Sequence, residues 1–236
     1  MLQATHYIPI VTTVISLAFA YVLFQHWNRK RTATYLVWWA IGVLTFGIGT
    51  STEAINALFG WSAANLKAWY ISGALFGAFP LAQGTVYLLF KKKTADIMAI
   101  LMTAYCVIAS VLILLSPIDM QAVTGALTGK VLAWSWVRAF SPIPNTYGLI
   151  FLVGGAIWSA IQYARKQDVG NRVLGNWLIA LGGLLPGIGG AFTRFGFVEA
   201  LFITEFFGIL LIWGGYRAML AATTPSIHPV QQQAGD

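Results

Sequence analysis

The sequence contains few charged residues and almost no cysteine. Only 9% of its 236 residues are Asp, Glu, Lys or Arg, whereas 58% are hydrophobic, and the mean hydropathy is +0.73. Soluble domains carry about 25% charged residues, so this composition predicts an integral membrane protein. The single cysteine, Cys106, excludes an intramolecular disulfide and a cysteine metal cluster.

Signals for enzyme chemistry are also missing. The three histidines, His6, His26 and His228, are too scattered for a metal or haem site within a bundle. The sequence has no glycine-rich phosphate loop, no nucleophile elbow and no pair of intramembrane aspartates. These absences argue against an enzyme, and we expect no catalytic residue and no metal site.

The chain contains seven apolar segments long enough to cross a bilayer, which takes about 20 residues each. We therefore expect an all-α, seven-helix transmembrane domain over residues 1–222, with an outer loop at 116–145 and a disordered cytoplasmic tail at 223–236. The expected spans are residues 7–25, 35–58, 69–90, 95–115, 146–163, 173–195 and 197–217.

The basic residues predict how the bundle is oriented. Of the 14 Lys and Arg residues, 10 follow spans one, three, five and seven, so they gather on one side. Because cytoplasmic loops are enriched in Lys and Arg, we expect the N-terminus outside and the C-terminus in the cytoplasm. The net charge of +7 then reflects topology, and we expect no nucleic-acid partner.

The outer loop is the one long connection. Its sequence "KVLAWSWVRAFSPIPN" contains Trp134, Trp136 and Phe140. This pattern is typical of an interfacial helix whose aromatic side chains lie at the membrane surface. A lid over an outward-facing cavity is the alternative.

Small residues recur at helical spacing on several spans and predict faces that pack closely. In span six we expect the close contact at Gly183 and Gly187. Pro80 in span three and Pro186 in span six should each kink the helix or free a carbonyl. The small-residue stripes are Asn176, Ala180, Gly183, Gly187, Gly190 and Arg194 in span six, Gly42, Thr45, Gly49 and Glu53 in span two, Gly73, Gly77, Pro80, Gly84 and Tyr87 in span three, and Glu205, Gly208, Ile212 and Gly215 in span seven.

Two carboxylates lie on these inward faces. Helical rise places Glu205 near the bilayer midplane and Glu53 in the outer third. An intramembrane carboxylate costs a few kcal/mol unless it is protonated, paired or hydrated. Arg194 has a simple partner in Glu199, which leaves Glu205 to be neutral and to donate a hydrogen bond to a neighbouring helix. A structural role, a ligand or ion site and proton movement all remain open for Glu205.

The candidate site is a polar pocket between spans two, three, six and seven. Glu205 and Glu53 are its acidic groups. We expect a hydrogen-bonding lining formed by Gln83, Tyr70 and Tyr87, and an outer electrostatic gate formed by Arg194 and Lys67. The first hypothesis is noncovalent binding of a small molecule or lipid in a receptor-like or sensory role. The alternatives are a proton-coupled transporter or carrier using Glu205, and a structural membrane subunit.

These hypotheses imply partners of three kinds. Membrane lipids would surround the spans, and a second copy could pack through the small-residue faces. A cytoplasmic signalling protein could dock on the basic loops, which signalling would require because no output domain is visible in the sequence.

Seven spans with this orientation resemble the microbial rhodopsins in topology. In that family the seventh helix carries the lysine that binds retinal as a Schiff base, but the segment "EALFITEFFGILLIWGGYR" has no lysine. Covalent retinal binding is therefore excluded, while a noncovalently bound lipid or pigment is still compatible with the sequence.

Three further segments give a closer resemblance. They are "TEAINALFGW", "WYISGALFGAFPLAQGTVYLL" and "LLPGIGGAFTRFG", which resemble uncharacterised seven-span proteins of bacterial membranes. This resemblance implies a multi-pass location in a bacterial inner membrane, and it implies no mechanism.

Overall fold

The computed structural model describes residues 4–166, 170–193 and 195–222. Within these ranges the chain is helical, with no strand and one isolated bridge between Ile118 and Leu132. Seven helical segments are long and apolar enough to cross a membrane, which confirms the predicted all-α class with seven spans. Arg194 and the predicted tail lie outside the described residues.

Five spans are continuous α-helices, and the third and fifth are interrupted. Each interrupted span is divided by a wide turn of π-helix, labelled η2 in the third span and η6 in the fifth. The bounds are α1 Ile8–Arg29, α2 Thr34–Phe59, α3 Ala63–Trp69, η2 Tyr70–Leu75, α4 Phe79–Leu89, α5 Lys92–Leu115, α6 Pro142–Gly148, η6 Leu149–Gly154, α7 Gly155–Arg165, α8 Asn171–Thr193 and α9 Val198–Ala221.

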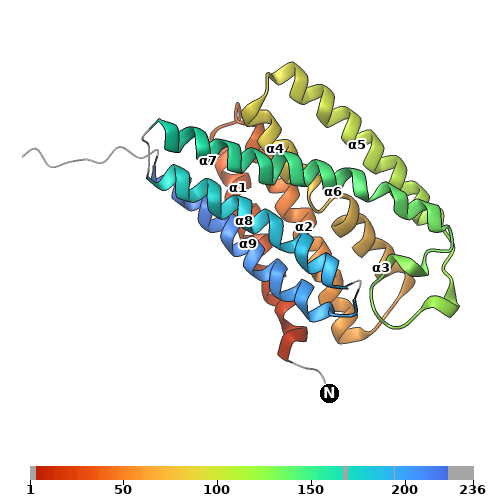
Figure 1. Ribbon diagram of the computed structural model, residues 1–236. Coiled ribbons are helices and arrows are strands. Elements are labelled where there is room, and N and C mark those ends of the chain that lie inside the picture. Colours follow the sequence, from red (N-terminus) through yellow and green to blue (C-terminus); the bar gives the residue numbers. More distant parts are fainter. Residues whose placement is uncertain (1–3, 167–169, 194, 223–236) are drawn as a thin grey trace, which may run out of the picture.

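The sides of the bundle are apolar. Along α5, the side chains of Ile100, Leu101 and Leu115 are more than 60% exposed, and Figure 1 shows α5 along one flank, away from α8 and α9. A soluble protein rarely exposes so much contiguous apolar surface. Such sides suit contact with lipid.

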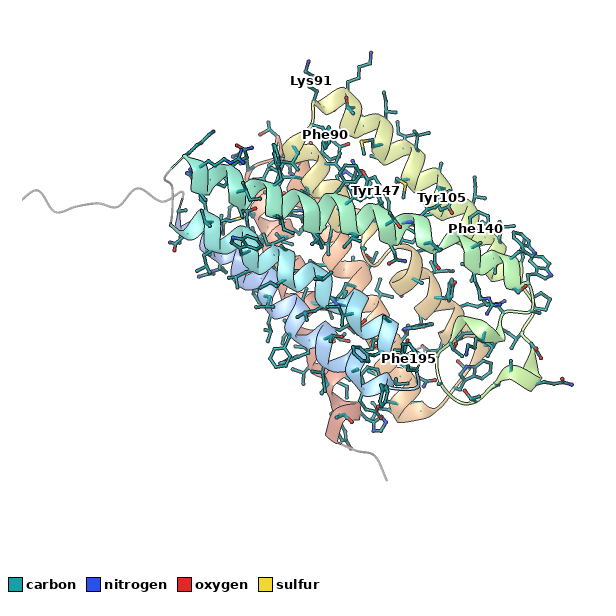
Figure 2. The ribbon with its side chains drawn as sticks, in the orientation of Figure 1. Phe90, Lys91, Tyr105, Phe140, Tyr147 and Phe195 are labelled. Atoms are coloured by element: carbon teal, nitrogen blue, oxygen red, sulfur yellow. The ribbon has the colours of Figure 1, made fainter. Side chains whose placement is uncertain are left out.

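The two ends of the bundle differ in charge. At the end where α1 finishes and α2 begins, here called the basic end, lie Arg29, Lys30 and Lys91. The opposite, N-terminal end holds η1 (Ala4–Tyr7) and the α2–α3 and α8–α9 connections. Figure 2 shows Lys91 and Phe195 toward these opposite ends.

The connection between α5 and α6 is a folded cap at the N-terminal end. Backbone hydrogen bonds from Asp119 to Val131 (2.8 Å) and from Ala133 to Pro117 (3.0 Å) close it on itself, and Val131 is buried against α3 and α5. The expected interfacial helix is only the 3₁₀ segment η5, one of three short 3₁₀ segments: η3 Met120–Ala122, η4 Gly129–Val131 and η5 Ser135–Phe140.

The helices α8 and α9 pack backbone to backbone, and they lie side by side in Figure 1. A Cβ atom on Gly182 would lie 2.6 Å from the Gly208 carbonyl oxygen, and one on Gly215 would lie 2.5 Å from that of Gly175. Such distances are too short for any side chain. Pro186 leaves the Gly182 carbonyl without its helical partner, and this carbonyl faces Gly208.

The predicted contact at Gly183 and Gly187 is therefore wrong. Gly183 faces Leu152 of η6, whereas a Cβ atom on Gly187 would have no neighbour within 4 Å among the residues that the structure describes. Successive residues of a helix lie about 100° apart, so α8 carries two adjacent glycine faces. The face that meets α9 has glycines spaced by seven, as does α9 itself: Gly175, Gly182 and Gly189 against Gly208 and Gly215.

We predict that Gly182→Ala destabilises the protein and Gly187→Ala does not. Overpacking costs about 1–3 kcal/mol, which in a chain of this size lowers Tm by about 2–4 °C per kcal/mol. At Gly187 the substitution should stabilise the helix slightly, because alanine favours helix over glycine. Thermal unfolding of both variants in nanodiscs measures the difference, and equal Tm values would contradict this packing.

Candidate functional site

The two glutamates predicted on inward faces meet in the structure. The carboxyl groups of Glu53 on α2 and Glu205 on α9 face each other closely enough to interact electrostatically. Along the helix axis, Glu53 lies about 9 Å before the end of α2, and Glu205 lies about 10 Å after the start of α9. The helix bounds thus place Glu205 at the same level as Glu53, nearer the N-terminal end than the midplane expected from the sequence.

The pair has one further hydrogen-bond donor. The indole Nε1 of Trp69, the last residue of α3, donates to Oε1 of Glu53 at 3.0 Å. Glu53 is only 3% exposed, and Oε2 of both glutamates is buried with no N–H or hydroxyl partner among the described residues. Because a carboxylate can only accept hydrogen bonds, a proton held between the two groups is what would satisfy these oxygens.

Next to the pair along the bundle lies the break in the third span. The η2 turn is closed by the hydrogen bond from Phe76 N to Ile71 O (3.0 Å), five residues apart, and α4 then begins at Phe79. Pro80 has no N–H group and cannot bond the carbonyl four residues earlier, that of Phe76. The break predicted at Pro80 is therefore present, and the carbonyl of Phe76 lacks its helical N–H partner.

Side chains from three neighbouring helices contact the carbonyls of this break. The Thr45 hydroxyl of α2 lies 3.1 Å from Phe76 O and 3.0 Å from Gly42 O of its own helix, so its one proton is shared between these two acceptors. The Asn145 amide of α6 donates to Ala74 O at 2.9 Å, and the Cys106 thiol of α5 lies 3.8 Å from Leu75 O. In a bilayer, irregular backbone persists only where protein or water satisfies it, and here protein side chains do so.

The interruption of the fifth span lies beside the break. A Cβ atom on Gly148, the residue before η6, would lie 2.5 Å from Cβ of Ala78. The glycine is thus required for the α6–η6 junction to approach the third span. Two irregular helices are therefore packed against each other, and wide helical turns of this kind occur frequently at functional sites.

One stripe of α2 contacts the third span on both sides of η2. Thr45 bonds to Phe76 after the turn, and Glu53 bonds to Trp69 before it. Between them, a Cβ atom on Gly49 would lie 3.6 Å from Cα of Gly73. The stripe predicted at Gly42, Thr45, Gly49 and Glu53 therefore faces the interrupted span along its whole length.

The other predicted residues do not join the pair. Gln83 is fully buried in a second cluster toward the basic end, where its amide donates to Ala95 O at 2.9 Å and accepts from the Tyr147 hydroxyl at 2.6 Å. Tyr87 donates to Asp96 at 2.7 Å, and Asp96 also pairs with Lys92. These residues tie α4 to α5 and α6.

The two remaining candidates within the described residues lie at the N-terminal end. Tyr70 is buried under the cap, where its hydroxyl contacts Ser141 Oγ at 3.4 Å, and Lys67 Nζ donates to Leu114 O at 2.8 Å. Neither bonds to a carboxylate. Arg194, predicted with Lys67 as a gate, lies outside the described residues.

The centre of the bundle holds a small apolar cavity. Its volume of about 10 Å³ is near the minimum for one water molecule, and apolar or aromatic side chains line it, including Phe19, Trp39 and Ile212. Within the described parts of the chain, no group of three or more His, Cys, Asp or Glu side chains could hold a metal ion.

Sequence reasoning missed Trp69 and Asn145. Trp69 stands among the aromatic residues near a span end, where tryptophan is common for other reasons. The freed carbonyl of Phe76 follows from Pro80 alone, but its partner could be identified only in three dimensions. No protein-family model, curated protein or solved structure matches this chain significantly, so the argument for function depends on the geometry.

We predict that Thr45→Val lowers stability by about 1 kcal/mol, the size typical of a hydrogen bond between membrane helices. The variant keeps the shape of the side chain and removes the donor to Phe76 O. Thr52→Val is the matched control, because the Thr52 hydroxyl bonds back to Gly49 O of its own helix at 2.6 Å. Thermal unfolding in nanodiscs gives both values.

Repeating the measurement in a Pro80→Ala background tests whether Thr45 compensates for the N–H group that proline lacks. Alanine restores an N–H group that can bond Phe76 O, so the cost of Thr45→Val should shrink there. An unchanged cost in the Pro80→Ala background would show that Thr45 does not compensate for the proline.

Proposed function

We propose that this chain is a multi-pass membrane protein that takes up and releases a proton at the Glu53–Glu205 pair, as a proton-coupled transporter or carrier. The observation that carries this proposal is the contact between two carboxyl groups from α2 and α9, away from the bundle ends. It favours the second of the three functions that the sequence left open.

The physical reason is electrostatic. Two ionised carboxylates in contact repel each other, and in a medium of low dielectric constant the repulsion is larger than in water. Carboxyl pairs of this kind in enzymes hold one proton between them. Among the described residues, the donor identified at this pair is neutral, the indole of Trp69, and a shared proton would relieve the repulsion.

The interrupted spans support transport over a static scaffold. Transporters commonly place broken helices beside their ion sites, and irregular backbone at membrane depth lines a path or a packed seam. Here the third span is interrupted directly after Trp69, and Gly148, the residue before the interruption of the fifth span, packs on Ala78 at the end of that break.

Ligand binding in a receptor-like role has less support. The predicted residues that the structure describes do not all converge, since Gln83 and Tyr87 belong to a separate cluster toward the basic end. The central cavity has room for about one water molecule. Receptor-like binding therefore stays a prediction from the sequence.

The orientation and location belong to the same proposal. The basic end would face the cytoplasm of a bacterial cell, according to the positive-inside rule. The Glu53–Glu205 pair would then lie in the outer part of the inner membrane, about 10 Å below the outer ends of its helices. A proton would reach it from outside first.

Proton flux into liposomes tests the proposal. After a drop in the external pH, we expect the wild-type protein to let protons into the liposomes and acidify the lumen, as read by an enclosed pH-sensitive dye. Glu205→Gln and Glu53→Gln should each reduce the rate at least about tenfold, the order of effect expected when a group that transfers the proton is removed.

Glu199→Gln is the matched control. Glu199 lies in the first turn of the same helix, outside the pair, and its substitution should leave the flux within about twofold of wild type. Equal flux in wild type, Glu205→Gln and Glu53→Gln would refute the proposal.

A further inference from the structure

The two members of the carboxyl pair have different surroundings. Glu53 is 3% exposed and accepts the Trp69 indole at Oε1, 3.0 Å away. Glu205 is partly exposed as a residue, and its carboxyl group faces that of Glu53. An N–H donor favours the charged form of the carboxyl that accepts it. Hydrogen bonds to an ionised acceptor are about twice as strong as those between neutral groups.

We propose that Trp69 is a positioning residue that keeps the negative charge of the pair on Glu53 and the proton on Glu205. This inference rests on the proposed function, because it assumes one shared proton, and it adds which carboxyl holds it. Glu205 is then the group from which the proton leaves, and Glu53 is the fixed charge beside it.

Other titratable groups lie on the elements around the pair. η1 packs on both α2 and α9 and carries His6 and Tyr7. Lys67 on α3 donates to Leu114 O, and Glu199 lies six residues before Glu205 on α9. Trp69 is the residue whose N–H group reaches a carboxyl oxygen of the pair.

The position of Trp69 links the charge to the interrupted span. It is the last residue of α3 and directly precedes the wide turn η2. A charge on Glu53 strengthens the bond to Trp69 and holds α3 against α2, whereas a neutral Glu53 weakens that bond. The location of one proton therefore changes the strength of the hydrogen bond that holds the start of the wide turn.

A thermal double-mutant cycle tests the assignment. Trp69→Phe keeps an aromatic ring and removes the donor. In Glu205→Gln, the new amide can donate to a charged Glu53, as a protonated Glu205 would. In Glu53→Gln, the acceptor of the Trp69 bond is neutral.

We expect Trp69→Phe to lower Tm by similar amounts in wild type and Glu205→Gln, and by about 2–4 °C less in Glu53→Gln. The packing loss is common to all three backgrounds, so the difference reports the charge. Equal losses in Glu205→Gln and Glu53→Gln would overturn the proposal. His6→Ala in the same backgrounds should show equal losses, and a charge-dependent loss at His6 instead of Trp69 would also overturn it.

Infrared spectroscopy of the full chain in nanodiscs gives a readout that packing alone would not change. At pH 7 we expect a protonated-carboxyl band in wild type that Glu205→Gln abolishes. Adding Trp69→Phe to Glu205→Gln should restore such a band, because Glu53 then lacks its donor. A band that persists in Glu205→Gln would place the proton on Glu53 and refute the inference.

The two proposals fail separately. If Glu205→Gln stops proton flux but the Trp69→Phe losses are equal, the assignment to Trp69 fails and proton coupling stands. If the cycle and the infrared band behave as expected but wild type moves no protons, the pair is a fixed buried site and the proposed function fails.

Discussion

The interior of a bilayer offers no water to a polar group, and this constraint organises the protein around its third span. Pro80 frees the carbonyl of Phe76, and the carbonyls of Ala74 and Leu75 belong to the last two residues of the wide turn before it. Their contacts come from Thr45, Cys106 and Asn145, on α2, α5 and α6. One irregular stretch thus fixes how three other helices are placed.

The Glu53–Glu205 pair faces the same constraint and meets it differently. The carbonyls of the break are satisfied by side-chain donors that cannot leave, whereas in the proposed function the two carboxyl groups share a proton that can. An indole supplies one hydrogen bond to Glu53, and Oε2 of each glutamate is buried with no hydrogen-bond partner among the described residues. The break is a permanent feature of the fold, and in the proposed function the protonation state of the pair changes.

The sequence predicted the fold well because length and hydropathy decide whether a segment can cross a bilayer. It also placed Glu53 and Glu205 on inward faces, since small residues at helical spacing mark close packing. It could not predict that they meet, because the sequence does not show which inward faces lie opposite each other. Nor could it choose between the two glycine faces of α8, which differ by one residue in register.

The α2 stripe connects these features and limits what a proton could change. Thr45 and Glu53 are about 12 Å apart on one continuous helix, and they bond to the third span after and before its wide turn. Only the bond at Glu53 depends on charge. In the proposed mechanism, a change at the pair therefore acts on α3, a helix of seven residues, while α4 stays bound to Thr45 and, through Gln83, to α5 and α6. The response to a proton is thus confined to the N-terminal end of the bundle, where the cap packs on α3.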